Sequence, residues 1–174
     1  MMFDRETLQL IQKLPIFSSL SLMEQRKLAG LNDLFHDFPK GGTFIMEEGT
    51  QGDSFHIIIQ GMAFVKVEAA PNKILARLKP GAICGEIAYL TGGKRSSSVV
   101  TQHEEVRTLV ITHRMFRTLG FDVRDKIKDG LIDVLVSRAV DMTDTIVDLK
   151  KDIAALQKEI IRLRKASVAN QAAG

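Results

Sequence analysis

The sequence has few of the residues that cross-link or anchor a chain. Its single cysteine, Cys84, excludes an internal disulfide, and this usage is typical of a reducing compartment. No apolar run approaches the roughly 18 residues that a membrane-spanning helix requires. Residues 1–6 lack the basic and then apolar order of a signal peptide. We therefore expect a soluble, cytoplasmic protein with no membrane segment.

The excess of charge of one sign is also small. The chain has 24 Lys and Arg residues against 21 Asp and Glu residues, a formal net charge of +3. Such an excess does not by itself indicate a nucleic-acid or membrane surface. Of the 174 residues, 45% are hydrophobic and 26% are charged, which is a globular composition. It excludes collagen-like, low-complexity and wholly disordered classes and predicts one domain plus an accessory element.

Two kinds of reactive site lack their sequence patterns. A metal-dependent jelly-roll enzyme needs converging histidines, as in His-x-His, whereas the four histidines here are scattered: His36, His56, His103 and His113. Residues 92–94 resemble part of a P-loop, but Ala88 and Arg95 stand where that motif requires Gly and Ser or Thr. We expect no metal, no cofactor and no catalytic residues, and thus a protein that is not an enzyme.

The apolar pattern changes from helical to extended and back. Residues 1–37 read as short helices: Pro15 ends the first, and Ser21 with Glu24 forms a capping box for a second that includes Leu31, Leu34 and Phe35. Residues 38–112 contain short β-segments at the spacing of a sandwich, jelly roll or barrel. These segments are residues 43–46, 54–59, 62–67, 74–78, 97–101 and 106–111. Residues 113–166 are helical again, and residues 167–174 are expected to form a flexible tail.

A stretch within the β-region, residues 85–98, carries the chemistry of a phosphate site. Gly85 allows the backbone to approach a ligand closely, and the start of a short helix directs free N–H groups at an anion. Arg95 can pair with that anion in bidentate fashion, and Ser96 adds a hydroxyl. The carboxylate of Glu86 is suited to a hydroxyl donor such as that of a ribose.

These residues resemble the phosphate-binding cassette of the cyclic nucleotide-binding domains, a family that includes the catabolite activator protein and protein kinase A regulatory subunits. The match consists of Gly85-Glu86-Ile87-Ala88 followed by Arg95-Ser96 at the usual spacing. Residues 14–20 are similar to the family's helical entry, and glycines at 49, 52, 61 and 81 fall where its turns lie. Cys84 departs from the common Phe, which affects packing.

The resemblance implies a fold and a set of contacts. The fold class would be α+β: an antiparallel, jelly-roll-like β-roll over residues 38–112, with the cassette at residues 83–98, flanked by N- and C-terminal helices. Arg95 would pair with the cyclic phosphate, and Glu86 would accept a hydrogen bond from the ribose 2′-hydroxyl. Gly85, Ile87, Ala88 and Ser96 would supply backbone or hydroxyl contacts. Ser96 favours cAMP weakly over cGMP.

The C-terminal helix shows a strict heptad pattern. Isoleucines occupy position a and leucines position d, in the order Ile146, Leu149, Ile153, Leu156, Ile160 and Leu163, with Met142 at the preceding d. β-Branched residues at a with leucine at d favour a parallel two-stranded coiled coil, expected over residues 139–166, with Glu159 facing Arg164 of a partner. The alternative is an amphipathic helix packed on its own β-domain, although such helices show a wider apolar stripe.

Gly130 interrupts the helical pattern, and two interpretations are open. A glycine within a helix costs about 1 kcal/mol relative to alanine, so it marks either a ligand-driven bend or a close helix contact. The part before the heptads, with Ile127, Leu131, Val134 and Leu135, is expected to pack on the β-domain and cover the ligand.

The sequence thus predicts a non-catalytic cyclic nucleotide sensor that forms a homodimer. No basic region precedes the heptads, where Asp141, Asp144 and Asp148 lie, so direct DNA binding is not expected. The output would require an effector protein of unknown identity. The alternative is a scaffold with the same fold that no longer binds nucleotide.

Overall fold

The computed structural model describes the backbone of residues 5–172 and the side chains of residues 5–163. The chain forms two units, one up to Leu131 and one from Ile132 onward. The first unit contains every strand and the cassette, so it holds the candidate site. The second unit consists of the remainder of the last helix.

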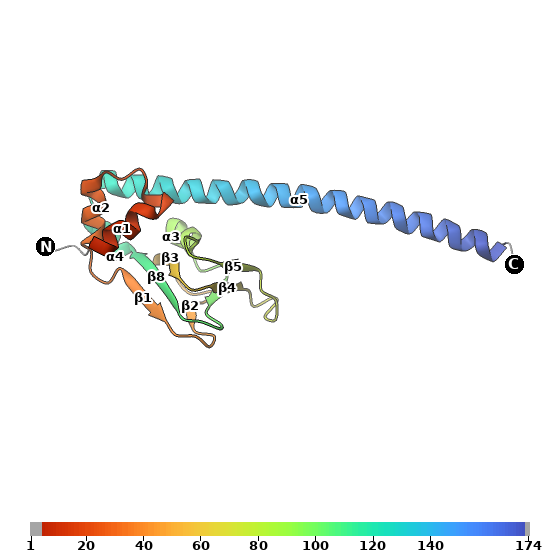
Figure 1. Ribbon diagram of the computed structural model, residues 1–174, viewed down its shortest axis with the longest axis horizontal. Coiled ribbons are helices and arrows are strands. Elements are labelled where there is room, and N and C mark those ends of the chain that lie inside the picture. Colours follow the sequence, from red (N-terminus) through yellow and green to blue (C-terminus); the bar gives the residue numbers. More distant parts are fainter. Residues whose placement is uncertain (1–4, 173–174) are drawn as a thin grey trace. The chain divides into compact units, whose positions relative to one another are not determined.

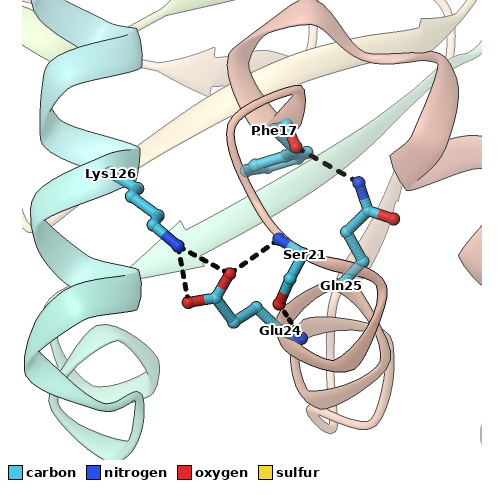
Figure 2. Close-up of polar contacts among 5 residues, drawn as sticks. All are labelled: Phe17, Ser21, Glu24, Gln25 and Lys126. Atoms are coloured by element: carbon cyan, nitrogen blue, oxygen red, sulfur yellow. Dashed lines mark hydrogen bonds and ion pairs between the residues drawn. The ribbon is translucent and has the colours of Figure 1, made fainter.

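The N-terminal helices follow the capping pattern, but the second is shorter than expected. Helix α1 (Arg5–Lys13) leads through the 3-10 helix η1 (Pro15–Phe17) to helix α2 (Leu22–Ala29). The capping box is confirmed: Ser21 N donates to Glu24 Oε2 at 2.7 Å, and Glu24 N donates to Ser21 Oγ at 3.4 Å, as Figure 2 shows.

The extension of the second helix to Phe35 was wrong. Gly30 caps α2, and Asp33 has a φ of 59°, in the left-handed region that ends helical structure. Phe35 instead begins strand β1 (Phe35–Phe38), which pairs antiparallel with the last strand. The apolar spacing of Leu31, Leu34 and Phe35 reflected burial beside a turn and not a helix.

Two four-stranded antiparallel sheets form the β-roll, which confirms the predicted fold class (Figure 1). One sheet has the order β1-β8-β3-β6 and the other the order β2-β7-β4-β5. The further strands are β2 (Phe44–Met46), β3 (Ser54–Gln60), β4 (Ala63–Lys66), β5 (Ala76–Leu78), β6 (Ile83–Cys84), β7 (Ser98–Val100) and β8 (Val106–Thr112). Strands β1 and β6 were not expected from the sequence. Phe35 of β1 was assigned to the second helix, and the two residues of β6 are too few to show an alternating pattern.

Gly61 makes the tight turn between β3 and β4. Its φ is 79°, and a β-carbon at this position would collide with the carbonyl oxygen of Glu105. A residue with a side chain would therefore need both a strained backbone and a displaced neighbour.

Three helices complete the chain: α3 (Glu86–Thr91), α4 (His113–Thr118) and α5 (Phe121–Ala172). Within the first unit, Ile127 and Leu131 of α5 are fully buried, while Val134 and Leu135, at the start of the second unit, are partly buried. That this part of α5 packs on the β-domain and covers the ligand stays a prediction. Gly130 does not interrupt α5. A β-carbon built on it would lie 2.7 Å from the carbonyl oxygen of Ile16, so the close-contact interpretation of this glycine has a physical basis.

The second unit is helical throughout its described length. The heptad positions are exposed in the single chain: Ile146 49%, Leu149 55%, Ile153 54%, Leu156 63%, Ile160 49% and Leu163 57%. The helical backbone extends to Ala172, into the segment expected to be a tail, and residues 173–174 lie outside the described residues. Among the described helices, none has the combination of length and apolar character that crossing a membrane requires.

Candidate functional site

The cassette, residues 83–98, connects β6 to β7 and contains the six-residue helix α3. Gly85 precedes the helix with a φ of 79°, and its carbonyl oxygen accepts the first helical hydrogen bond from Tyr89 N at 3.1 Å. Because the first N–H groups of any helix lack partners within it, this turn presents backbone donors. Glu86 is the first residue of α3 and is only 2% exposed.

Arg95 closes the cassette on itself. Its Nη1 donates to the carbonyl oxygen of Gly85 at 2.7 Å, and its Nη2 donates to Ser54 Oγ at 3.1 Å. A β-carbon on Gly85 would collide with the guanidinium, so a glycine is required there for a second reason besides its φ. Burial lowers the pKa of the Arg95 guanidinium, whereas the nearby carboxylates of Asp53 and Glu86 raise it. A buried guanidinium whose hydrogen-bond acceptors are neutral can still be stabilised by an anionic partner.

The six residues predicted for ligand binding fall into two groups. Glu86, Ala88 and Arg95 are buried, and they fix the shape of the cassette. Ile87 is 50% exposed, Ser96 is exposed and Gly85 is half-buried, so these three are accessible from the surface. The structure brings Gly85, Glu86 and Arg95 together although eight residues lie between the two charged ones.

A segment that the sequence indicated only as turns holds the cassette in place. We call residues 49–53 the clasp loop. It exchanges four hydrogen bonds with the end of the cassette: Gly49 N to Arg95 O at 2.8 Å, Arg95 N to Thr50 O at 2.8 Å, Gly52 N to Gly93 O at 3.0 Å and Gln51 Nε2 to Gly92 O at 2.7 Å. Gly52 also packs on Ala88 of α3 so closely that a β-carbon there would collide with the Ala88 methyl group. The clasp loop and the cassette therefore form one structural element.

A buried polar chain extends from Arg95 into the sheet, and sequence reasoning missed it. Ser54 Oγ lies 3.5 Å from His56 Nε2, and His56 Nδ1 lies 3.0 Å from Thr108 Oγ1. Burial lowers the pKa of His56 to about 4, and the charge of Arg95 acts in the same direction. The imidazole is therefore neutral near pH 7 and can accept at one nitrogen while donating at the other. The first five residues of β3, from Ser54 on, are all buried, and a continuous run of this kind gave no signal that distinguishes polar from apolar partners.

The other side of α3 packs through Tyr89. Its ring makes edge-on contacts with Phe55 at 5.0 Å, His113 at 4.2 Å and Phe116 at 5.7 Å between centroids. His113 Nε2 donates to the Tyr89 carbonyl oxygen at 3.0 Å. The cassette helix is thus fixed to β3 and α4 by aromatic contacts.

The scattered histidines do not converge. Among the described residues, no three His, Cys, Asp or Glu side chains lie together in a way that could hold a metal ion. Cys84 is a buried free thiol, only 6% exposed, in the core of the β-roll.

Comparison with known sequences identifies what this arrangement resembles. Residues 36–121 match the profile of the family described as Cyclic nucleotide-binding domain. The chain is 29% identical over 117 residues to the cGMP-dependent protein kinase, isozyme 1, of Drosophila melanogaster, covering 65% of this chain and 15% of the kinase. It is 36% identical over 94 residues to a cAMP-dependent protein kinase regulatory subunit of Aspergillus fumigatus, covering 53% of this chain and 22% of that protein. The chain thus spans less than a quarter of either relative.

Solved structures show the same fold. A cyclic nucleotide-binding domain from Methylobacillus flagellatus superimposes with a TM-score of 0.66 at 24% identity, covering 82% of this chain and 81% of that one. The regulatory domain of Toxoplasma gondii PKA, solved with cAMP, gives a TM-score of 0.59 at 20% identity, covering 78% of this chain and 49% of that one.

Proposed function

Because residues 36–121 belong to the cyclic nucleotide-binding domain family, we propose that this chain is a non-catalytic cyclic nucleotide sensor. The observation that carries the proposal is the pairing of Arg95 with Gly85 in a cassette that also buries Glu86. One cation, Arg95, and one carboxylate, Glu86 at the start of α3, match a ligand with one phosphate charge and one free ribose hydroxyl.

The ligand contacts follow from the donors available. In this proposal Arg95 pairs with the cyclic phosphate, aided by Ser96 and by backbone N–H groups at the start of α3. Glu86 accepts a hydrogen bond from the ribose 2′-hydroxyl. Gly85, Ile87 and Ala88 supply the close backbone and apolar contacts. We favour cAMP over cGMP on the basis of Ser96, while both kinds of kinase are among the relatives.

Calorimetric titration with cAMP and cGMP tests the ligand proposal. Loss of one member of a buried, hydrogen-bonded charge pair costs about 2 kcal/mol or more, so Arg95→Ala is expected to bind at least roughly 30-fold more weakly. Lys94→Ala is the matched control, because it removes the same charge from an exposed neighbouring residue. Arg95→Lys keeps the charge if the alanine variant folds poorly. Wild-type binding no tighter than that of either Arg95 variant contradicts the proposal.

The second candidate function is a scaffold that uses the fold without binding cAMP or cGMP. Two structural neighbours favour keeping it: one is the regulatory subunit of a cAMP-independent protein kinase A from Trypanosoma brucei, and another, from Trypanosoma cruzi, is bound to guanosine. The same titration separates the two candidates, since a scaffold shows no binding of either cyclic nucleotide.

We further propose that the chain forms a homodimer through residues 139–166. Six isoleucines and leucines at a and d positions are about half exposed in the single chain, more apolar surface than an isolated helix keeps in water. Their strict four-three spacing fits a second copy of the same helix. Glu159 Oε1 pairs within the chain with Arg162 Nη2 at 2.8 Å, and the predicted partner residue Arg164 lies outside the described side chains.

The output of the sensor is proposed to pass to an effector protein. The described residues show no basic segment before the heptads, so direct DNA binding is not part of this proposal. The relatives are kinases and kinase regulatory subunits of which this chain matches only a part, so the identity of the effector is left to experiment.

A further inference from the structure

A pocket of 270 Å³ lies behind the cassette helix, between α3, α4 and the first turns of α5. Its lining includes two aromatic rings, one imidazole and three cations: Tyr89, Phe116, His113, Arg117, Arg124 and Lys128. All these residues belong to the first unit. No carboxylate is among the lining residues, so the pocket carries three positive charges with no acid in its wall.

The three cations converge from two helices. Arg117 is in the last turn of α4, and Arg124 and Lys128 are four residues apart on α5, which places them on the same face of that helix. Like charges at this spacing destabilise a helix by roughly 0.2–0.5 kcal/mol. The arrangement therefore costs stability unless an anion lies between the charges.

Internal partners do not neutralise this cluster. Within residues 5–163, Arg117 and Arg124 form no ion pair, and Arg124 instead stacks over the Phe121 ring at 5.8 Å. Lys128 Nζ lies 3.8 Å from Asp125 Oδ1, a long contact between two half-exposed groups that is worth little in water. Two further polar atoms of lining residues, Tyr89 Oη and Arg124 Nε, are buried with no hydrogen-bond partner among the described residues. Buried donors of this kind are normally satisfied, so both indicate an acceptor at this pocket.

We propose that this pocket is a second anion site that binds a phosphate group, either free or as a small phosphomonoester. A phosphate dianion has oxygens in several directions and can accept from the two guanidinium groups, which favour bidentate contacts, and from the lysine. A planar carboxylate offers less charge and fewer directions. The apolar rings of Phe116 and Tyr89 form the wall against which the organic part of an ester would pack. This site shares Tyr89 with the cassette helix but uses different cations, since the cation of the cassette is Arg95.

The test is a titration of the full ¹⁵N-labelled chain with inorganic phosphate at constant ionic strength, balanced with chloride, while the amide signals of residues 113–128 are followed. We expect saturable shifts for the wild type. Loss of one charge-assisted contact is expected to weaken binding at least about tenfold in Arg117→Gln and in Arg124→Gln. Arg114→Gln is the matched control: it removes the same charge from α4, three residues earlier, but does not line this pocket. Arg95→Gln is expected to leave these shifts unchanged.

Three outcomes would overturn the proposal. The first is a set of shifts that increase without saturation. The second is an equal loss of phosphate binding in Arg114→Gln, which would show a general charge effect. The third is a loss of phosphate binding in Arg95→Gln, which would place the phosphate in the cassette. A parallel titration with ribose 5-phosphate distinguishes the two sources. Tighter binding than inorganic phosphate, with added shifts at Phe116, indicates an ester, and equal binding indicates the free ion. The outcome does not depend on cyclic nucleotide binding.

Discussion

Gly130 of α5 packs directly against the backbone of Ile16 in η1. A β-carbon on Gly130 would lie 2.7 Å from the carbonyl oxygen of Ile16 and 3.0 Å from its Cγ1. The glycine thus lets the last helix approach the N-terminal helices within the first unit. A ligand-driven bend at Gly130 stays a prediction, which a comparison of the helix geometry with and without cyclic nucleotide would test.

Gly130→Ala is expected to destabilise the protein. Alanine gains about 1 kcal/mol of helix propensity, but the new methyl group meets a backbone oxygen, and overpacking of this kind costs about 1–3 kcal/mol. We expect a net loss of about 1 kcal/mol in urea denaturation. Ser137→Ala, at an exposed position of α5, controls for propensity and should be neutral or slightly stabilising. A stabilised Gly130→Ala protein would show that the contact is not restrictive.

Glu24 should contribute stability that depends on pH. Its carboxylate accepts from Lys126 Nζ at 2.9 Å and from Ser21 N at 2.7 Å, and these bonds lower its pKa to about 2 (Figure 2). A lowered pKa stabilises the folded state above the ordinary value of 4.5, and this stability is lost as the pH falls from 4.5 toward 2.

Urea denaturation between pH 2 and pH 6 checks this expectation. Glu24→Gln should lack that part of the acid-induced loss of stability. Lys126→Gln should reduce the loss, because Lys126 is the largest cause of the lowered Glu24 pKa. Ser21→Ala removes only the cap and should cost about 1 kcal/mol at neutral pH. Identical pH profiles for wild type and Glu24→Gln would contradict the assignment.

His56 should make the fold sensitive to mild acid. Its pKa is lowered from 6.5 to about 4, so its contribution to stability is complete above pH 6.5 and is lost as the pH falls toward 4. A shift of this size corresponds to a change on the order of 3 kcal/mol. His56→Gln should flatten the denaturation profile over that interval. Arg95→Gln should raise the pKa of His56, measured by NMR titration of its ring, because it removes a neighbouring positive charge.

Ser54→Ala tests the polar chain beside the cassette. The change removes the acceptor for Arg95 Nη2 and the neighbour of His56 Nε2, and a buried charged donor without its acceptor costs about 1–3 kcal/mol. We expect lower stability and a weaker affinity for cyclic nucleotide. Ser98→Ala is the matched control, since this buried serine accepts from Glu48 N and does not contact Arg95. Equal affinity losses in both variants would argue against a specific role for Ser54.

The homodimer can be tested on one face of α5. Replacing Ile153 and Leu156 with Asp removes apolar side chains whose burial is worth about 1.5–3 kcal/mol each, so dimer dissociation should increase by at least about 100-fold. Ile161→Asp is the control, because Ile161 is equally exposed but lies outside the a and d positions. Sedimentation equilibrium gives the association state. A monomeric wild type at high concentration, or equal effects of the control, would rule out this interface.

The sequence predicted features that depend on local patterns. The capping box at Ser21, the positions of the longer strands and the start of α4 each rest on neighbouring residues, and the structure shows them where expected. The helical assignment of Phe35 was wrong because its apolar spacing is typical of a helix and the left-handed turn at Asp33 was not recognised. Short strands such as β6 carry no periodic signal.

In the candidate site too, residues close in the sequence were predicted and long-range contacts were not. Gly85, Glu86 and Arg95 were predicted as site residues because they follow one another along the chain in a known order. Ser54, His56 and Thr108 were not, because their relation to Arg95 arises from strand pairing between β3 and β8, over a separation of 52 residues for His56 and Thr108. Long-range polar contacts of this kind leave no local pattern.

The contact between Gly52 and Ala88 has one more consequence. Since the clasp loop is bonded to the end of the cassette and touches the middle of its helix, any displacement of α3 must carry residues 49–53 with it. A fluorescent label attached near Thr50, at the protein surface, should therefore report movements of α3 from outside the cassette.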